Sequence, residues 1–156
     1  MLLAALVFGC YTNHAGFVAS GAAVDLDRRE VVLSNAAEVV TLPLSVFPET
    51  ERRRIAADYV LGHPEAGAAA LLVPQSVRRA VEADAKARRR SRLRAEKGLC
   101  TLEESDAFCV KSSAALSAWL DDKQNRGEIL PAERKAIGVI ADDTATSSFF
   151  RIKLEE

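Results

Sequence analysis

Hydrophobic and polar residues alternate along the first third of the chain with the two-residue period that is typical of β-strands. Short segments rich in β-forming residues are separated there by residues suited to turns. These segments are 17–26, 30–34 and 38–44. Their close succession predicts an antiparallel meander. The apolar run 1–10 predicts a fourth, more buried strand of the same sheet.

Signals for helices follow the predicted sheet. Pro48 is suited to the start of a helix, which we expect to run through Leu61 and to stop at Gly62. A longer helix is predicted over 77–97, and Gly98 ends it. The connection to the next helix is short, so we expect the two long helices to form an antiparallel hairpin.

The helix after Gly98 has the clearest start signal in the chain. Thr101 and Glu104 have the spacing of a capping box, and the helix is expected to end near Lys123. A helical wheel gathers its large apolar residues on one side, which we expect to be buried. These residues are Leu102, Phe108, Cys109, Leu116, Trp119 and Leu120.

The order of these elements predicts an α+β fold in a single domain, 1–156: a small antiparallel sheet, then the helical hairpin, then a short C-terminal strand. Val139–Ile140 and the segment 149–154 are the apolar runs from which strands near the end are expected. The predicted parts are a sheet-rich lobe over about 1–62, a helical lobe over about 74–127 and a return segment over 128–156.

One stretch resembles a small bacterial domain family of unknown function. Residues 31–35, followed by the Pro-Leu-Ser-Val-Phe-Pro sequence of 43–48, are similar to its strand, turn and Pro-Leu-Ser-Trp-Phe-Pro-like signature. The resemblance covers about 31–59. Here Val46 replaces the aromatic residue, one extra residue precedes Pro43, and the later Trp-Pro and acidic segment of the family is missing. The resemblance implies a sheet followed by a helix, sometimes in DNA-binding or toxin–antitoxin contexts, and no catalytic residues.

Composition limits the classes of protein that the chain can belong to. Apolar residues make up 49% and charged residues 28% of the 156 residues, which is ordinary for a globular domain. The longest apolar run, 1–10, has about half the length that a membrane-spanning helix needs, so no membrane partner is expected. The three cysteines, an odd number without framework spacing, indicate free thiols in a reducing compartment, and we expect a cytoplasmic protein.

Charge is distributed unevenly along the chain. The segment 74–97 contains nine Lys and Arg residues against three acidic residues, a net charge of +6, whereas the whole chain has a net charge of −1. On a helical wheel, one side of the helix over 77–97 is expected to present an exposed basic face. Its residues are Arg78, Arg79, Lys86, Arg89, Arg90 and Lys97. The opposite side, with Val77, Ala80, Ala87 and Ala95, is expected to pack against the protein.

A continuous basic face suits an anionic partner, because guanidinium groups bind phosphates and carboxylates through paired hydrogen bonds. The sequence therefore predicts a non-enzymatic binding or assembly module whose partner is the nucleic-acid backbone or an acidic protein surface. No aromatic residue is interleaved with the arginines, so base stacking is not expected. The alternative is that the arginines pair with the protein's own acids. A homo-oligomer is compatible with either interpretation.

Cys100 is the candidate for an alternative function, that of a small cysteine-dependent enzyme. It precedes a predicted helix and lies near Lys97, and both features favour the thiolate. Its general base would have to be His14 or His63, the only histidines. Cys10, His14, Cys100 and Cys109 match no common zinc spacing, and Asp142–Asp143 is interpreted as an acidic turn. No metal site, cofactor or familiar catalytic motif is predicted.

Overall fold

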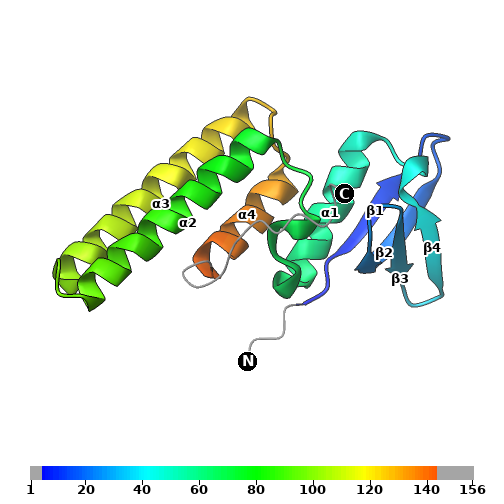
Figure 1. Ribbon diagram of the computed structural model, residues 1–156. Helices are drawn as coiled ribbons and strands as arrows, with labels where there is room; N and C mark the ends of the chain where they lie inside the picture. Colours follow the sequence, from blue (N-terminus) through cyan, green and yellow to red (C-terminus); the bar gives the residue numbers. More distant parts are fainter. Residues whose placement is uncertain (1–4, 144–156) are drawn as a thin grey trace.

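A four-stranded antiparallel sheet forms one end of the molecule (Figure 1). The computed structural model describes residues 5–143. The strands follow one another in chain order, as the sequence predicts for a meander. They are β1 (Phe8–Thr12), β2 (Val18–Leu26), β3 (Glu30–Ser34) and β4 (Val39–Pro43). The three strands after β1 agree with the sequence-based bounds to within one residue at each end.

The first strand differs from its prediction because it lies at an edge of the sheet and pairs only with β2. It begins at Phe8, and its side chains alternate between exposed and buried. Tyr11 is fully buried, whereas Phe8 is 61% exposed. The apolar run alone could not show that only one side of this strand is covered.

A β-bulge interrupts the alternation of β2. Ala23 lies opposite Leu33 and Leu26 opposite Val31, with a register shift between Ala23 and Asp25. Ala23 and Leu26 are three residues apart yet both lie opposite buried residues of β3. The bulge therefore keeps Leu26 on the side of the sheet that α1 covers.

Helices form the rest of the described chain and lie in successive layers beside the sheet (Figure 1). Next to the sheet is α1, then α4, and the hairpin of α2 and α3 is farthest from the sheet. The helical elements are η1 (Leu44–Val46), α1 (Glu49–Gly62), η2 (Pro64–Ala70), α2 (Gln75–Glu96), α3 (Leu102–Asn125) and α4 (Pro131–Asp143). The predicted helical hairpin is confirmed.

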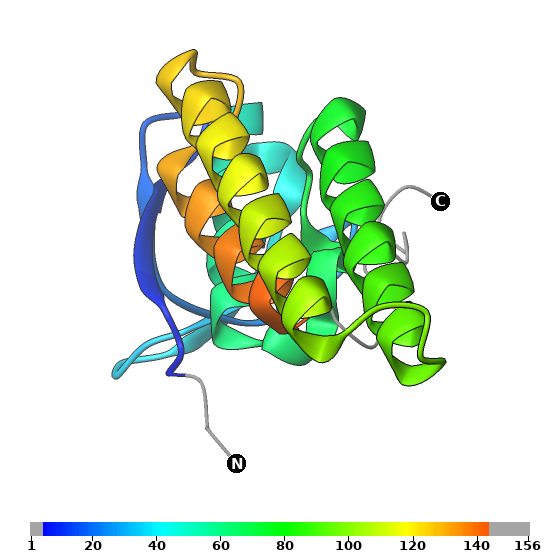
Figure 2. The same ribbon diagram turned by 90° about the vertical axis from the view of Figure 1, so that its left-hand side faces the viewer.

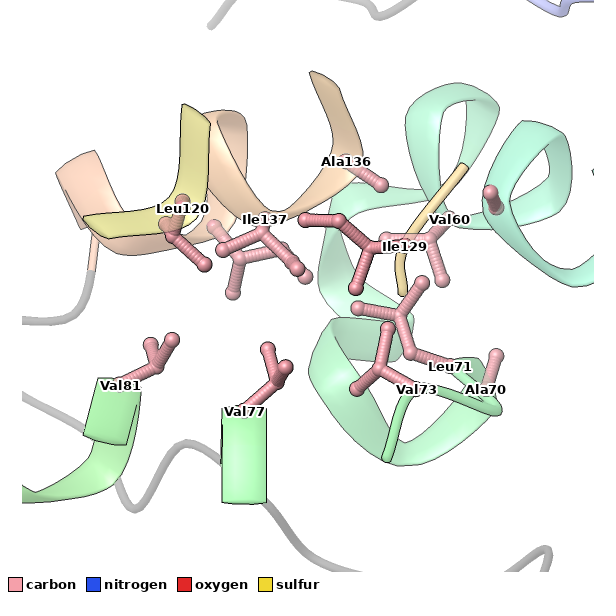
Figure 3. Packing of buried hydrophobic residues seen from close by; sticks show 12 residues of the cluster. Val60, Ala70, Leu71, Val73, Val77, Val81, Leu120, Ile129, Ala136 and Ile137 are labelled. Carbon is pink, nitrogen blue, oxygen red and sulfur yellow. The ribbon is translucent and has the colours of Figure 1, made fainter. Parts of the chain in front are cut away.

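Two hydrophobic clusters meet along α1. One lies between the sheet and α1, and Tyr11, Leu33 and Phe47 are its largest fully buried members. The other joins α1, α2, α3 and α4, and Figure 3 shows its aliphatic side chains converging between these helices. Leu26 and Tyr59 pack against both clusters. They connect the sheet to the helical part through apolar contact.

The second cluster also explains why the C-terminal region is helical where a strand is expected at Val139–Ile140. The buried residues of α4 recur at intervals of three and four positions, as one side of a helix requires. They are Glu133, Ala136, Ile137 and Ile140. The strand prediction for Val139–Ile140 is therefore wrong, and the predicted strand over 149–154 lies outside the described residues. No helix within residues 5–143 is long and apolar enough to cross a membrane.

Candidate anion-binding surface

The basic helix α2 begins directly after Pro74 and ends with a glycine turn. Gly98 has a φ of 73°, which a residue with a side chain rarely adopts, and its N–H donates to the carbonyl of Ala95. The N–H of Leu99 donates to the carbonyl of Arg94. The chain then reverses into α3, whose Thr101 side chain accepts a hydrogen bond from the Glu104 N–H at 3.0 Å. This bond confirms the cap expected at Thr101.

Two arginines of α2 are buried. Arg78 is only 6% exposed, and its Nη2 donates to the carbonyl of Leu71 at 3.1 Å. The expectation that Arg78 belongs to the exposed basic face is therefore wrong. Arg78 helps to hold α2 against the segment before it, because its guanidinium satisfies a backbone carbonyl in the protein interior.

Arg88 is the second buried arginine, and it belongs to a network that joins three helices. Its Nε donates to Asp84 Oδ2 at 2.9 Å, and its Nη2 donates to the carbonyl of Ala141 in α4 at 3.1 Å. The hydroxyl of Ser112 in α3 donates to the other oxygen of Asp84. The side chains of Asp84 and Arg88 are each 7% exposed. This network is structural, since it ties α2 to α3 and α4.

Four other basic side chains lie in one line on the exposed side of α2. We call them the basic stripe: Arg79, Lys86, Arg90 and Lys97. They are seven, four and seven residues apart, so they point within about 40° of one another along about 27 Å of helix. The buried Val81 lies on the opposite side of α2. The stripe therefore faces away from the core.

Within residues 5–143, only one member of the stripe forms an ion pair. Lys86 Nζ lies 3.2 Å from Glu82 Oε1, and both side chains are largely exposed, so the pair is weak. Among the described residues, no acidic side chain pairs with Arg79, Arg90 or Lys97. The alternative, in which the protein's own acids neutralise the stripe, therefore does not apply to these three side chains there.

Arg89 is placed beside the stripe and is partly buried. Its Nε has less than 1 Å² of exposed surface and no hydrogen-bond partner among the described residues. A helical wheel places Arg89 with the exposed residues because it treats the helix as isolated. In the folded chain it is less accessible than its neighbour Arg90.

The structure does not bring Cys100 together with a histidine. Cys100 lies at the tip of the α2–α3 hairpin, and its Sγ contacts the carbonyl of Ser91 at 3.8 Å. His63 follows α1, where its ring stacks on Tyr59, and His14 lies in the turn between β1 and β2. The tip and the sheet are at opposite ends of the molecule (Figure 1).

The other candidate ligands are also separated. Cys10 is exposed on β1 and Cys109 is buried between α2 and α3, and all three cysteines are free thiols. No group of three or more metal-ligating side chains occurs within residues 5–143. Asp142–Asp143 ends α4 and does not form the expected turn after a strand.

Sequence reasoning missed a second basic region that only folding assembles. Arg28 and Arg29, in the turn between β2 and β3, line a hollow of about 490 Å³ together with Arg52 of α1. Its wall is apolar and includes Leu44 and Leu72. No periodicity links a turn to a helix more than twenty residues later, so the sequence contains no signal for this hollow.

The comparisons with known proteins do not identify the chain: no family model, curated protein or solved structure matches it.

Proposed function

We propose that this protein is a non-enzymatic module that binds the nucleic-acid backbone through the basic stripe of α2. One observation carries the proposal: four cationic side chains are aligned and exposed, and three of them have no acidic partner within residues 5–143. A cation without an internal partner is free to neutralise a phosphate and release its counterions.

The shape of the surface favours a nucleic acid over an acidic protein. A specific protein interface needs a desolvated apolar centre, and only Ala83 and Leu93 lie close to the stripe along its length. Contacts to phosphates need no such centre, because hydrogen bonds and charge supply the affinity. The straight helix spaces its cations at intervals of about 6–10 Å, comparable to the distances between nearby phosphates.

The test compares binding of a labelled duplex at several salt concentrations. If all four cations contact phosphates, log K should fall against log salt with a slope of about −3.6. The double variant Arg79→Glu, Arg90→Glu should weaken binding more than about tenfold and make the slope shallower. Base sequence should have little influence, because backbone contacts do not distinguish bases.

A matched control separates a local effect from a change in net charge. Arg126→Glu with Lys135→Glu alters the charge equally at two exposed positions outside α2 and outside the second basic region, and should leave most of the binding intact. Equal losses in both double variants, or no binding at about 50 mM salt, would overturn the proposal. If polyglutamate binds and the duplex does not, an acidic protein partner is supported.

A further inference from the structure

Phe108 is exposed on the side of α3 where the sequence predicts core. It is 44% exposed, although Cys109 beside it is buried. Ala115 and Trp119 follow at seven and eleven residues, which places the three side chains in one row on α3. Trp119 is only partly buried, and Lys123 Nζ lies 5.1 Å from the centre of its ring.

This row lies on the side of α3 that is away from α4, although part of Trp119 also packs against the helical cluster. Ser117 lies two residues before Trp119, and two residues on a helix point about 200° apart. Ser117 bonds Arg134 of α4 at 2.7 Å, so Trp119 lies on nearly the opposite side of α3. Figure 2 shows α2 and α3 in front of α4 and the sheet, and no other described element covers them on that side.

Small residues of α2 border the row. Ala80 and Ala87 each lie two residues after a buried residue of α2, Arg78 and Ala85 respectively. They therefore also point away from the core, and both are partly exposed. The hairpin thus presents an outer face with large side chains along α3 and small ones along α2: Ala80, Ala87, Phe108, Ala115 and Trp119.

We propose that a second copy of this chain covers the outer face and that two hairpins pack as a four-helix dimer. The geometry is self-complementary. Two hydrogen bonds between the helices of the hairpin, Ser91 with Ser105 and Asp84 with Ser112, show which residues lie at the same height. By this register, Ala87 of α2 lies at the height of Phe108 of α3 to within about one residue. A two-fold axis parallel to the hairpin lays α2 of one copy on α3 of the other. Each Phe108 then meets the small Ala87 of the other copy.

Charge favours this arrangement over the other two-fold packing. Arg94 borders the outer face on α2, and Glu104 borders it on α3, and both are exposed. With α2 on α3, each Arg94 lies within about two residues of the level of Glu104 in the other copy. With α2 on α2, the arginines of both copies would face each other and repel. The two-fold symmetry repeats this pair, and both copies of it lie near the hairpin tip.

The basic stripe borders this interface, since Arg90 lies about 40° from Arg94 around α2. Phe108→Glu tests the dimer without altering any residue of the stripe, so failure of the dimer and failure of the proposed function are distinguishable.

The experiment is sedimentation equilibrium of the full chain from about 2 to 200 µM, a range that covers dimers of modest interface area. The wild type should approach twice its chain mass of 16.9 kDa at the upper end. Phe108→Glu should weaken association at least about fiftyfold, because it places a charge in the interface centre. Val110→Glu is the matched control: Val110 is 71% exposed and points about 200° from Phe108, so this variant should dimerise normally.

Charge exchange tests the register. Arg94→Glu and Glu104→Arg should each weaken self-association about tenfold, and an equimolar mixture of the two variants should associate as well as the wild type, because the mixed pair restores opposite charges. A wild-type chain that stays monomeric at 200 µM overturns the proposal. A dimer that Phe108→Glu leaves intact also overturns it, since the interface would then lie elsewhere, for example at the exposed Phe17 in the connection between β1 and β2. Unchanged circular dichroism of each variant shows that folding is not the cause.

Discussion

Tyr11 shows how a single buried polar group fixes the edge strand to the helix beneath it. Its hydroxyl donates to Asp58 Oδ2 at 2.7 Å, and the guanidinium of Arg54 lies 5.3 Å from the centre of its ring. Burial, followed by the hydrogen bond to Asp58, raises the pKa of Tyr11 far above its ordinary value of 10.0. Burial likewise raises the pKa of Asp58, against the opposing effect of the Tyr11 hydroxyl. Each of the two groups therefore keeps its proton to a higher pH than a free side chain of its kind does.

A pH-dependent stability follows from the raised pKa of Tyr11. Below pH 10 the tyrosine is protonated in both the folded and unfolded states; above it, only the unfolded chain releases the proton, so the folded state loses stability as pH rises. Between pH 8 and 10.5 this residue should account for a loss of about 0.8 kcal/mol. Urea unfolding at both pH values should show a loss that is larger by this amount in the wild type than in Tyr11→Phe, because Tyr59, whose pKa is also raised by burial, is present in both proteins. Equal losses in both proteins would contradict the assignment.

At the scale of elements, ion pairs in the same helix have different roles according to their burial. The pair of Asp84 and Arg88 is buried, bonds Ser112 of α3 and reaches α4 through Ala141. The pair of Glu82 and Lys86 has the same spacing but lies in solvent. Spacing in the sequence cannot distinguish them, because the difference arises from the neighbours that folding brings to one side of α2.

Removing the carboxylate of Asp84 should therefore lower the free energy of unfolding more than removing that of Glu82. Asp84→Ala takes away a carboxylate that is bonded to the buried Arg88 and to Ser112, and should lower the free energy of unfolding by about 3 kcal/mol. Glu82→Ala, the control, should cost less than about 0.5 kcal/mol. Chemical denaturation of both variants measures the difference. Similar costs would show that the Asp84 network does not hold the hairpin in place.

At the scale of the whole molecule, burial is concentrated around α1 and α4 and decreases toward the hairpin tip. Leu71, Leu120 and Ile137 are at most 2% exposed in the helical cluster. Among residues 91–106, by contrast, Ser105 alone is buried, while Leu99 and Leu102 are 63% and 72% exposed. The tip lacks the apolar contacts that stabilise the base of the hairpin.

This gradient predicts a gradient of local stability. Amides in 92–98 and 102–106 should exchange with solvent through openings of lower free energy than amides in 112–120, because few buried groups resist opening at the tip. Hydrogen exchange with mass spectrometry at low protein concentration measures both regions. Equal amide protection in the tip and in 112–120 would contradict the prediction. If the proposed dimer forms, amides near Phe108 should exchange more slowly at high protein concentration.

The sequence by itself determined the bounds of most elements. Turn residues, the Thr101 cap and Gly98 act within a few residues of their own positions, so local chemistry is sufficient to place the ends of strands and helices. The same holds for the concentration of positive charge in α2. Where the local signal is weak, as at Val139–Ile140, a two-residue apolar run predicts a strand, but packing on α1 makes this segment helical.

Only the tertiary structure decided which side of each helix is covered. A helical wheel orders side chains relative to one another, but the direction of the core depends on partners that are distant in sequence. Arg78 is buried because Leu71 and the helical cluster lie beside it, and Phe108 is exposed because α4 packs on the other side of α3. The basic stripe and the outer face of the hairpin are therefore properties of the folded chain, since burial depends on all the contacts that a residue makes.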